Sequence, residues 1–326
     1  MNLLVSYYLI KRTVIGSLPK LSNDIVEAIK LAANIQLKNG IHIISDGEQR
    51  FDMINYFNQI PGLKGEKRLY ISGKIKPMEN VETFYKIVDF KILKSYLEEI
   101  GRSDVKIKTS ITGPITLGFI CAMNGLNYYS SIFDENIYYD LSNALKPIIN
   151  RLLELNSFVQ IDEPGISSGF IDPKKSIEIL NFMLSNLTIE SKDFEKISIH
   201  ICGDLTRIKG LMDEILKLKV KTLSLAFSGK KEKGNINLIN KEKLEFFNKN
   251  LGVGCASVTV RNINEVDSIE KIFNLIKEIV NKVGLSNIAY FHPDCGLKEV
   301  PIEIADEILH RIKTATEKLN CSNLPT

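Results

Sequence analysis

Residues 158–203, FVQIDEPGISSGFIDPKKSIEILNFMLSNLTIESKDFEKISIHICG, hold the pattern that decides the fold. Two short apolar runs, Phe158–Ile161 and Ile197–Ile201, flank an amphipathic stretch that opens at Asp172-Pro173. Proline is common at the first position of a helix, so the stretch reads as a helix. A strand, a helix and a second strand in this order predict two parallel strands joined by a crossover.

The same alternation continues in both directions along the chain. Eight apolar runs lie at Val14–Leu18, Ile41–Ser45, Val105–Ile111, Phe158–Ile161, Ile197–Ile201, Thr222–Phe227, Leu251–Val258 and Asn287–Phe291. They are continuous rather than alternating hydrophobic runs, which is typical of parallel strands covered on both faces. Eight strand–helix units predict an α/β fold, a (β/α)8 TIM barrel. An open doubly wound sheet is the competing arrangement, but no glycine-rich dinucleotide fingerprint follows the first run.

Amphipathic stretches predict helices at residues 21–38, 88–100, 135–155, 172–187, 206–218, 241–248, 266–283 and 301–319. Residues 50–104 are longer than one helix needs. We therefore expect Phe51–Val81 to form an excursion over the barrel mouth after strand 2, with Pro61-Gly62 and a hairpin arm at Leu69–Ser72. No linker rich in Gly, Ser or Pro divides the chain, so residues 1–326 are expected to form a single domain.

Composition excludes several classes of protein. The apolar fraction of 44% and charged fraction of 25% are ordinary for a globular chain and exclude disorder. A net charge of +3 is too small to indicate a nucleic-acid partner. No apolar run is long enough to span a bilayer, and no export signal is evident. We expect a cytoplasmic protein without a membrane partner, whose five cysteines are reduced.

Reactive residue types gather where the predicted strands end. In a TIM barrel these ends share one rim, and the active site lies there. The segments that reach this rim are Gly16-Ser17, Asp46-Gly47-Glu48, Asp162-Glu163, His200-Ile201-Cys202 and His292-Pro293-Asp294-Cys295. Carboxylates, imidazoles and thiols therefore converge on one side of the predicted barrel.

Three of these residues suggest a metal site. His200 and Cys202 are two positions apart on a strand, so their side chains point to the same side. Cys295 follows the last strand, which the barrel brings near. One imidazole and two thiolates are a donor set for zinc, and three protein ligands leave the open position of a catalytic site. The alternative is that these cysteines are small buried hydrophobes.

The acids at the rim suggest a binding site for an amino acid. Carboxylates over a pocket are costly unless they meet a cation, and a substrate ammonium group would satisfy Glu48 and Asp162. Ser17 offers a hydroxyl and backbone N–H groups to a substrate carboxylate. Two alternatives stay open: Asp162 and Glu163 could cap the following turn, and Glu48 could pair with Arg50. His292 could orient Cys295 or line the cavity.

Six segments occur in a diagnostic order: TVIGSLP, SDGEQRFDMINYF, ITGPITL, QIDEPG, HICGD and PDCGL. This series resembles the catalytic barrel of the cobalamin-independent methionine synthase family, in particular its short archaeal form. The resemblance implies a (β/α)8 fold and transfer of a methyl group to the zinc-bound thiolate of L-homocysteine, which forms L-methionine. It also implies that His200, Cys202 and Cys295 are zinc ligands. Ser17, Glu48 and Asp162 match positions that hold the amino acid part of homocysteine.

The chain departs from the family pattern in two ways. The family has a glutamate ligand in a stretch like ITIETS, whereas this chain has LSLAFS, with Ala226 at that position. The fourth zinc ligand is then water, Glu232, Asp204 or another residue. Second, the long members add an N-terminal half that helps to bind folate, and that half is missing here.

We therefore expect the methyl donor to be a methyl-corrinoid protein or a separately encoded partner rather than folate. Two alternatives remain. One is a zinc methyltransferase that acts on another thiol, such as coenzyme M, and the other is a non-catalytic module that binds zinc or a corrinoid partner.

Overall fold

The computed structural model describes residues 10–188 and 191–321. Seven parallel strands form one curled sheet in the order β1-β4-β5-β6-β7-β8-β9. Their bounds are β1 Ile43–Ile44, β4 Lys106–Thr112, β5 Phe158–Asp162, β6 Ile197–Ile201, β7 Thr222–Ala226, β8 Asn250–Ala256 and β9 Ile288–Pro293. The predicted α/β class and the parallel pairing are confirmed, and seven of the eight predicted runs contain or overlap a strand.

The segment before β1 lies between the two edge strands of this sheet. Thr13 N–H donates to Phe291 O at 2.9 Å, and Ile43 N–H donates to Arg12 O at 3.2 Å. Parallel bridges pair Arg12 with Phe291 and Thr13 with Ile43. The expected first strand at residues 14–18 is wrong in position, because the strand pairing ends at Thr13. After Thr13, the Ile15 carbonyl accepts hydrogen bonds from the side chains of Ser110 and Gln160 rather than from the backbone of a neighbouring strand.

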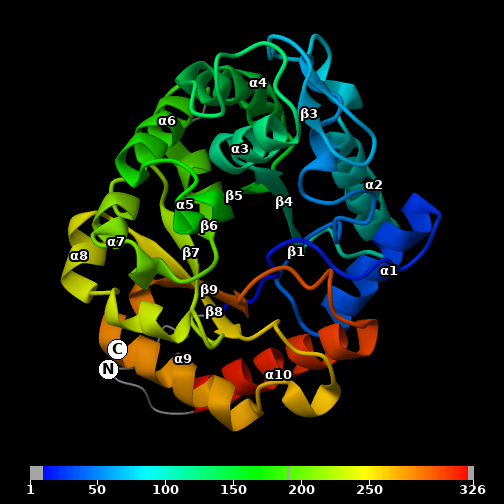
Figure 1. Cartoon of the computed structure of the whole chain (residues 1–326). Coiled ribbons are helices and arrows are strands. Elements are labelled where there is room, and N and C mark those ends of the chain that lie inside the picture. Colours follow the sequence, from blue (N-terminus) through cyan, green and yellow to red (C-terminus); the bar gives the residue numbers. More distant parts are fainter. Residues whose placement is uncertain (1–9, 189–190, 322–326) are drawn as a thin grey trace.

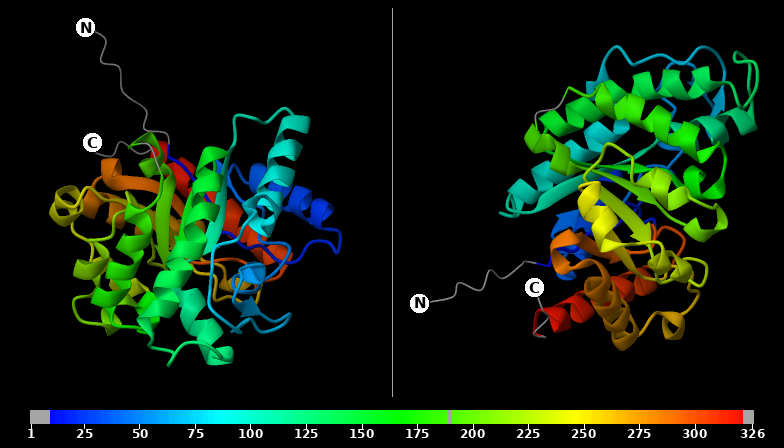
Figure 2. Two further views of the ribbon diagram at one scale, coloured as in Figure 1. Left: turned by 90° about the horizontal axis from the view of Figure 1, so that it is seen from above. Right: turned by 90° about the vertical axis from the view of Figure 1, so that its left-hand side faces the viewer.

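Helices follow the strands and cover the outside of the sheet (Figure 1). Their bounds are α1 Ile25–Lys38, α2 Tyr85–Glu99, α3 Pro114–Asn124, α4 Glu135–Glu154, α5 Pro164–Ser168, α6 Pro173–Ser185, α7 Leu211–Ile215, α8 Lys241–Phe246, α9 Ile269–Val283 and α10 Ile302–Cys321. Figure 2 shows α9 packed beside α10 and, elsewhere on the outside, α4 packed beside α6. The sequence did not predict α3 and α5, which begin with proline directly after strands β4 and β5. None of the described helices combines the length and apolar character that crossing a bilayer requires.

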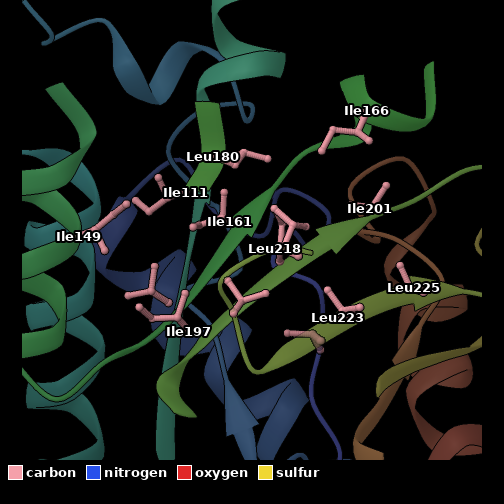
Figure 3. Packing of buried hydrophobic residues seen from close by; sticks show 14 of the residues in the cluster. Ile111, Ile149, Ile161, Ile166, Leu180, Ile197, Ile201, Leu218, Leu223 and Leu225 are labelled. Atoms are coloured by element: carbon pink, nitrogen blue, oxygen red, sulfur yellow. The ribbon is translucent and has the colours of Figure 1, made fainter. Parts of the chain in front are cut away.

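The two faces of the strands differ in chemistry, although both are buried. Apolar side chains face the helices, and Figure 3 shows Ile111, Ile161 and Leu223 of the sheet in one apolar layer with Ile149 of α4 and Leu180 of α6. The alternate residues are largely polar and line the inside of the curled sheet. They include Lys108, Ser110, Gln160, Asp162, His200, Ser224, Tyr290 and His292, all buried. The prediction of continuous hydrophobic strands was thus correct about burial and wrong about the inner face.

An irregular segment separates β1 from α2. It contains a short 3-10 helix at Asn55–Phe57 and an antiparallel hairpin of β2 (Leu63–Lys64) and β3 (Tyr70–Ile71). The second strand of the hairpin, β3, lies within the predicted arm at Leu69–Ser72, whereas β2 precedes that arm. Thr112 Oγ1 donates to Met53 O at 2.6 Å, and Lys298 Nζ donates to Phe51 O at 2.6 Å. These bonds attach the segment to the carboxyl end of β4 and to the loop after β9, while its place over the mouth stays a prediction.

Glu163 fastens the end of β5 to the start of α3. Its carboxylate accepts hydrogen bonds from the backbone N–H groups of Ile115 and Thr116, both at 2.9 Å, and from Thr116 Oγ1 at 2.6 Å. A Cβ on Gly113 would lie 2.1 Å from Glu163 Oε1, so glycine is required there. Glu163 therefore caps the helix of the preceding unit and not the following turn.

The Glu163 cap predicts a pH-dependent stability. Burial raises the pKa of Glu163 from 4.5 to about 7. The folded state therefore holds the Glu163 proton more tightly than the unfolded state does. The stability that protonated Glu163 contributes is fully present below pH 4.5 and is lost as the pH rises through about 7. Between these limits, we expect the free energy of unfolding of the wild type to fall by up to about 3 kcal/mol more than that of Glu163→Gln. Urea unfolding at half-unit pH steps measures this difference, and parallel curves for the two proteins would contradict it.

Candidate metal centre

His200, Cys202 and Cys295 meet at the carboxyl end of the sheet. One ligand atom of each lies within 4.8 Å of the other two, and no other such group of three or more residues occurs in the described parts of the chain. His200 is the second-last residue of β6, Cys202 directly follows β6, and Cys295 lies in the loop after β9. His200 is buried, and both cysteines are half-buried. The sequence therefore identified three side chains that do come together.

The loops that carry these residues are fastened by hydrogen bonds. Ser167 Oγ donates to Cys202 O at 2.5 Å. Asp294, next to Cys295, accepts from the backbone N–H groups of Phe227, Ser228 and Gly229 at 3.0, 3.0 and 2.6 Å. The loop after β9 is thereby tied to the loop after β7, which fixes the Cys295 thiol relative to β6.

The donor atoms of the three residues fit a metal ion. His200 Nδ1 lies 3.0 Å from Ser224 Oγ, whereas its Nε2 is buried and has no hydrogen-bond partner. An unpaired buried nitrogen is costly, so it calls for a partner. The Cys202 thiol holds the pKa of Cys295 well below its usual range, while contact with Cys295 raises the pKa of Cys202. A free imidazole nitrogen beside one easily ionised thiol and a second thiol suits a zinc ion.

Neither Asp204 nor Glu232, the two candidates for a fourth ligand, is a member of this group. Ala226 ends β7, is buried and offers no ligand atom. The Asp204 carboxylate instead caps the next turn, where it accepts from Thr206 N–H at 2.9 Å. Glu232 lies against Gly229, since a Cβ at Gly229 would be 2.2 Å from Glu232 Oε2. Within the described residues, the group that could hold a metal (the metal group) therefore consists of three side chains, those of His200, Cys202 and Cys295.

Ser17 and Asp162 lie beside the metal group. A Cβ on Gly296 would be 2.2 Å from Ser17 Oγ, so the Ser17 hydroxyl lies directly against the neighbour of Cys295. Leu297 N–H also donates to Ser17 O at 2.9 Å. Asp162 pairs in register with His200 of the next strand.

Glu48 is held by a lysine that the sequence did not suggest. Lys86 of α2 is fully buried, and its Nζ lies 2.7 Å from Glu48 Oε1 and 3.8 Å from the centre of the Tyr56 ring. Arg50, which the sequence offered as an alternative partner of Glu48, pairs with Asp89 instead, at 2.6 Å. Glu48 has a φ of 49°, which is uncommon for a residue with a side chain and points to a locally constrained backbone.

Asp162 is oriented by a buried lysine and a glutamine. Lys108 Nζ donates to Gln160 Oε1 at 2.5 Å, so the Gln160 amide presents its Nε2 to Asp162 Oδ1 at 2.6 Å. Burial raises the pKa of Asp162 to about 7, an effect that His200 opposes and Glu48 reinforces. The two carboxylates are thus close enough to influence each other. Lys108 and Gln160 could have been found as polar residues inside apolar runs, whereas Lys86 gave no signal.

His292, Cys121 and Cys255 have other surroundings. His292 contacts Ser224 Oγ through Nε2 at 2.9 Å rather than orienting Cys295. Cys121 and Cys255 are fully buried in the apolar core.

Comparisons with known proteins bear directly on this arrangement. The family described as "Cobalamin-independent synthase, Catalytic domain" matches residues 11–318. The methionine synthase of Methanocaldococcus jannaschii is 31% identical over 89% of this chain and 88% of that protein. That of Methanothermobacter thermautotrophicus is 31% identical over 85% of this chain and 84% of that protein.

Solved structures show the same fold. A B12-independent methionine synthase from a Shewanella species, solved with selenomethionine, aligns with a TM-score of 0.75 at 17% identity, over 96% of this chain and 98% of that one. A methyltransferase from Methanosarcina mazei aligns with a TM-score of 0.63 at 14% identity, over 95% and 94%. The match to the family extends through every strand of the sheet and all three residues of the metal group, and the chain is a methyltransferase that belongs to the cobalamin-independent methionine synthase family.

Proposed function

We propose that this protein transfers a methyl group to the sulfur of L-homocysteine at a zinc ion held by His200, Cys202 and Cys295. The observation that carries the proposal is the convergence of these three donors within 4.8 Å in a chain of this family. Zinc bound there would lower the pKa of a substrate thiol and so supply a thiolate at neutral pH.

The residues beside the metal group suit the amino acid part of homocysteine. Among the described residues, Lys86 bonds to Oε1 of Glu48 and Gln160 to Oδ1 of Asp162. The second oxygen of each carboxylate would then accept a hydrogen bond from the substrate ammonium, and Ser17 would hold the substrate carboxylate. Because Lys86 and Gln160 fix both carboxylates beforehand, little ordering remains to be done on binding.

Ala226 bears on the methyl donor. Two thiolates carry two negative charges, whereas a ligand set that includes a glutamate carries three. With the less anionic ligand set, the zinc-bound homocysteine sulfur would be a weaker nucleophile. Such a sulfur suits a donor whose methyl group is strongly activated. A methyl-corrinoid protein is such a donor, and we propose it in place of folate.

Two further inferences concern the fold. We infer that residues 11–13 occupy the eighth strand position of a (β/α)8 barrel, since they bond to both edge strands. We also infer a single domain, in which residues 51–81 lie over the mouth. The cytoplasmic location stays a prediction.

Methyl transfer can be tested with purified, zinc-loaded protein. We expect methylcobalamin, as a stand-in for a corrinoid protein, to convert L-homocysteine to L-methionine at least about tenfold faster than a methylated folate does. Cys295→Ser should abolish the reaction, whereas Cys121→Ala, a buried cysteine outside the site, should keep it. The proposal would be contradicted if neither donor gave methionine, or if the protein methylated coenzyme M in preference to homocysteine.

The role of Asp162 can be tested with two substrates. Asp162→Asn removes the charge that would meet the ammonium, so we expect KM for homocysteine to rise by about 10- to 100-fold. Mercaptobutanoate with a terminal thiol lacks the amino group and is the matched control, because its KM should be nearly equal for both proteins. Steady-state kinetics with both thiols measures the effect. An equal loss for the two thiols would assign Asp162 to general structure instead.

A further inference from the structure

A buried chain of hydrogen bonds leads from a backbone carbonyl to His200. His292 Nδ1 lies 2.7 Å from Pro293 O, and His292 Nε2 lies 2.9 Å from Ser224 Oγ. The same hydroxyl oxygen lies 3.0 Å from His200 Nδ1. All three side chains are buried, with exposed fractions of 2% for His200 and 0% for Ser224 and His292.

The end of the chain at Pro293 sets every proton along it. A carbonyl oxygen can only accept, so His292 Nδ1 must carry a hydrogen and donate it. The neutral ring has one N–H group, and its Nε2 therefore accepts from the Ser224 hydroxyl. Since Ser224 has given its only hydrogen to His292, its oxygen accepts from His200, whose Nδ1 must be the protonated nitrogen.

This proton arrangement leaves His200 Nε2 with a bare lone pair. Independently, Nε2 is a buried atom without a hydrogen-bond partner. It belongs to the side chain that lies with the two cysteine thiols in the metal group. The tautomer set from Pro293 and the open side of the ring thus agree.

β8, which lies between β7 and β9, has glycines in register with both residues. Ser224 is in register with Gly252, and His292 is in register with Gly254. A Cβ on Gly252 would lie 2.4 Å from the Tyr290 ring, and one on Gly254 would lie 2.7 Å from Asp294 Oδ1. The glycines thus leave room for Tyr290 and Asp294, which flank His292 in the sequence, and His292 of β9 bonds to Ser224 of β7 across β8.

We propose that His292 and Ser224 are positioning residues, which hold His200 in the tautomer that presents an unprotonated Nε2 to the metal. Neither residue is a member of the metal group, and both act through His200. A preset tautomer spares the site a rearrangement on metal binding, and partners of this kind raise metal affinity by about 10- to 100-fold in other proteins. This inference rests on the proposed metal site.

The test begins with the metal-free wild type and requires no variant. The chain has only four histidines, so long-range ¹H–¹⁵N correlation spectra of ¹⁵N-histidine-labelled protein can be assigned by single substitutions. We expect both His200 and His292 to carry their proton on Nδ1. A proton on Nε2 of His200 would overturn the proposal, whatever the metal affinity.

Two variants then separate position from packing. His292→Phe removes the acceptor for Ser224, and we expect His200 to populate both tautomers and zinc affinity to fall about 10- to 100-fold. His292→Gln places an oxygen acceptor near the same point and should restore both properties. His310→Gln, on the exposed side of α10, is the unaffected control. If His292→Phe does not fold, Ser224→Ala removes the same link in the chain.

The readouts distinguish failure of this proposal from failure of the metal site. Zinc affinity is measured by competition with a chromophoric chelator, without any assay of activity. If the wild type binds zinc, and His292→Phe and Ser224→Ala both keep the wild-type zinc affinity and His200 tautomer, only the positioning role is overturned. A wild type that shows the expected tautomers but binds no zinc contradicts the proposed function.

Discussion

The hydrogen bonds that residues 11–13 make to both edge strands hold the site together. Phe291 of β9 pairs with Thr13, and Thr13 pairs with Ile43 of β1. Beyond this link, the loop after β9 is also tied to the chain after Thr13, because Leu297 N–H donates to Ser17 O at 2.9 Å. In this arrangement Cys295 lies near His200 and Ser17, and Glu48 lies within electrostatic reach of Asp162. The curling of the sheet thus brings residues that are far apart in the sequence together at one site.

A second constraint is that the inside of the curled sheet is lined by buried polar side chains. Buried polar groups cost stability unless they are paired, and most of those inside this sheet bond to one another or to backbone. Lys108, for example, bonds to Gln160 and to the carbonyl of Val14. Five buried side-chain nitrogen or oxygen atoms have no partner in the described structure, and His200 Nε2 alone among them belongs to the metal group. The pairing that stabilises the interior also marks where a ligand is required.

Sequence reasoning succeeded where a local rule applied. Spacing by two residues placed His200 and Cys202 on one side of a strand, and the strand-end rule for barrels brought Cys295 to them. It failed where partners come from other strands or helices. The pairing of Glu48 with Lys86, the cap that Glu163 gives α3, and the contact of His292 with Ser224 all depend on register and curling, which the sequence pattern did not specify. The first strand was misplaced because strand pairing ends at Thr13, and the carbonyls of residues 14 and 15 bond to side chains inside the sheet instead of to the backbone of a neighbouring strand.

The most direct test of the account is zinc X-ray absorption spectroscopy on the reduced protein, before and after addition of L-homocysteine. The account predicts one zinc per chain with two sulfur ligands and one imidazole nitrogen from the protein, and one additional sulfur after homocysteine is added. An absence of bound zinc, or a zinc shell that homocysteine leaves unchanged, would contradict it.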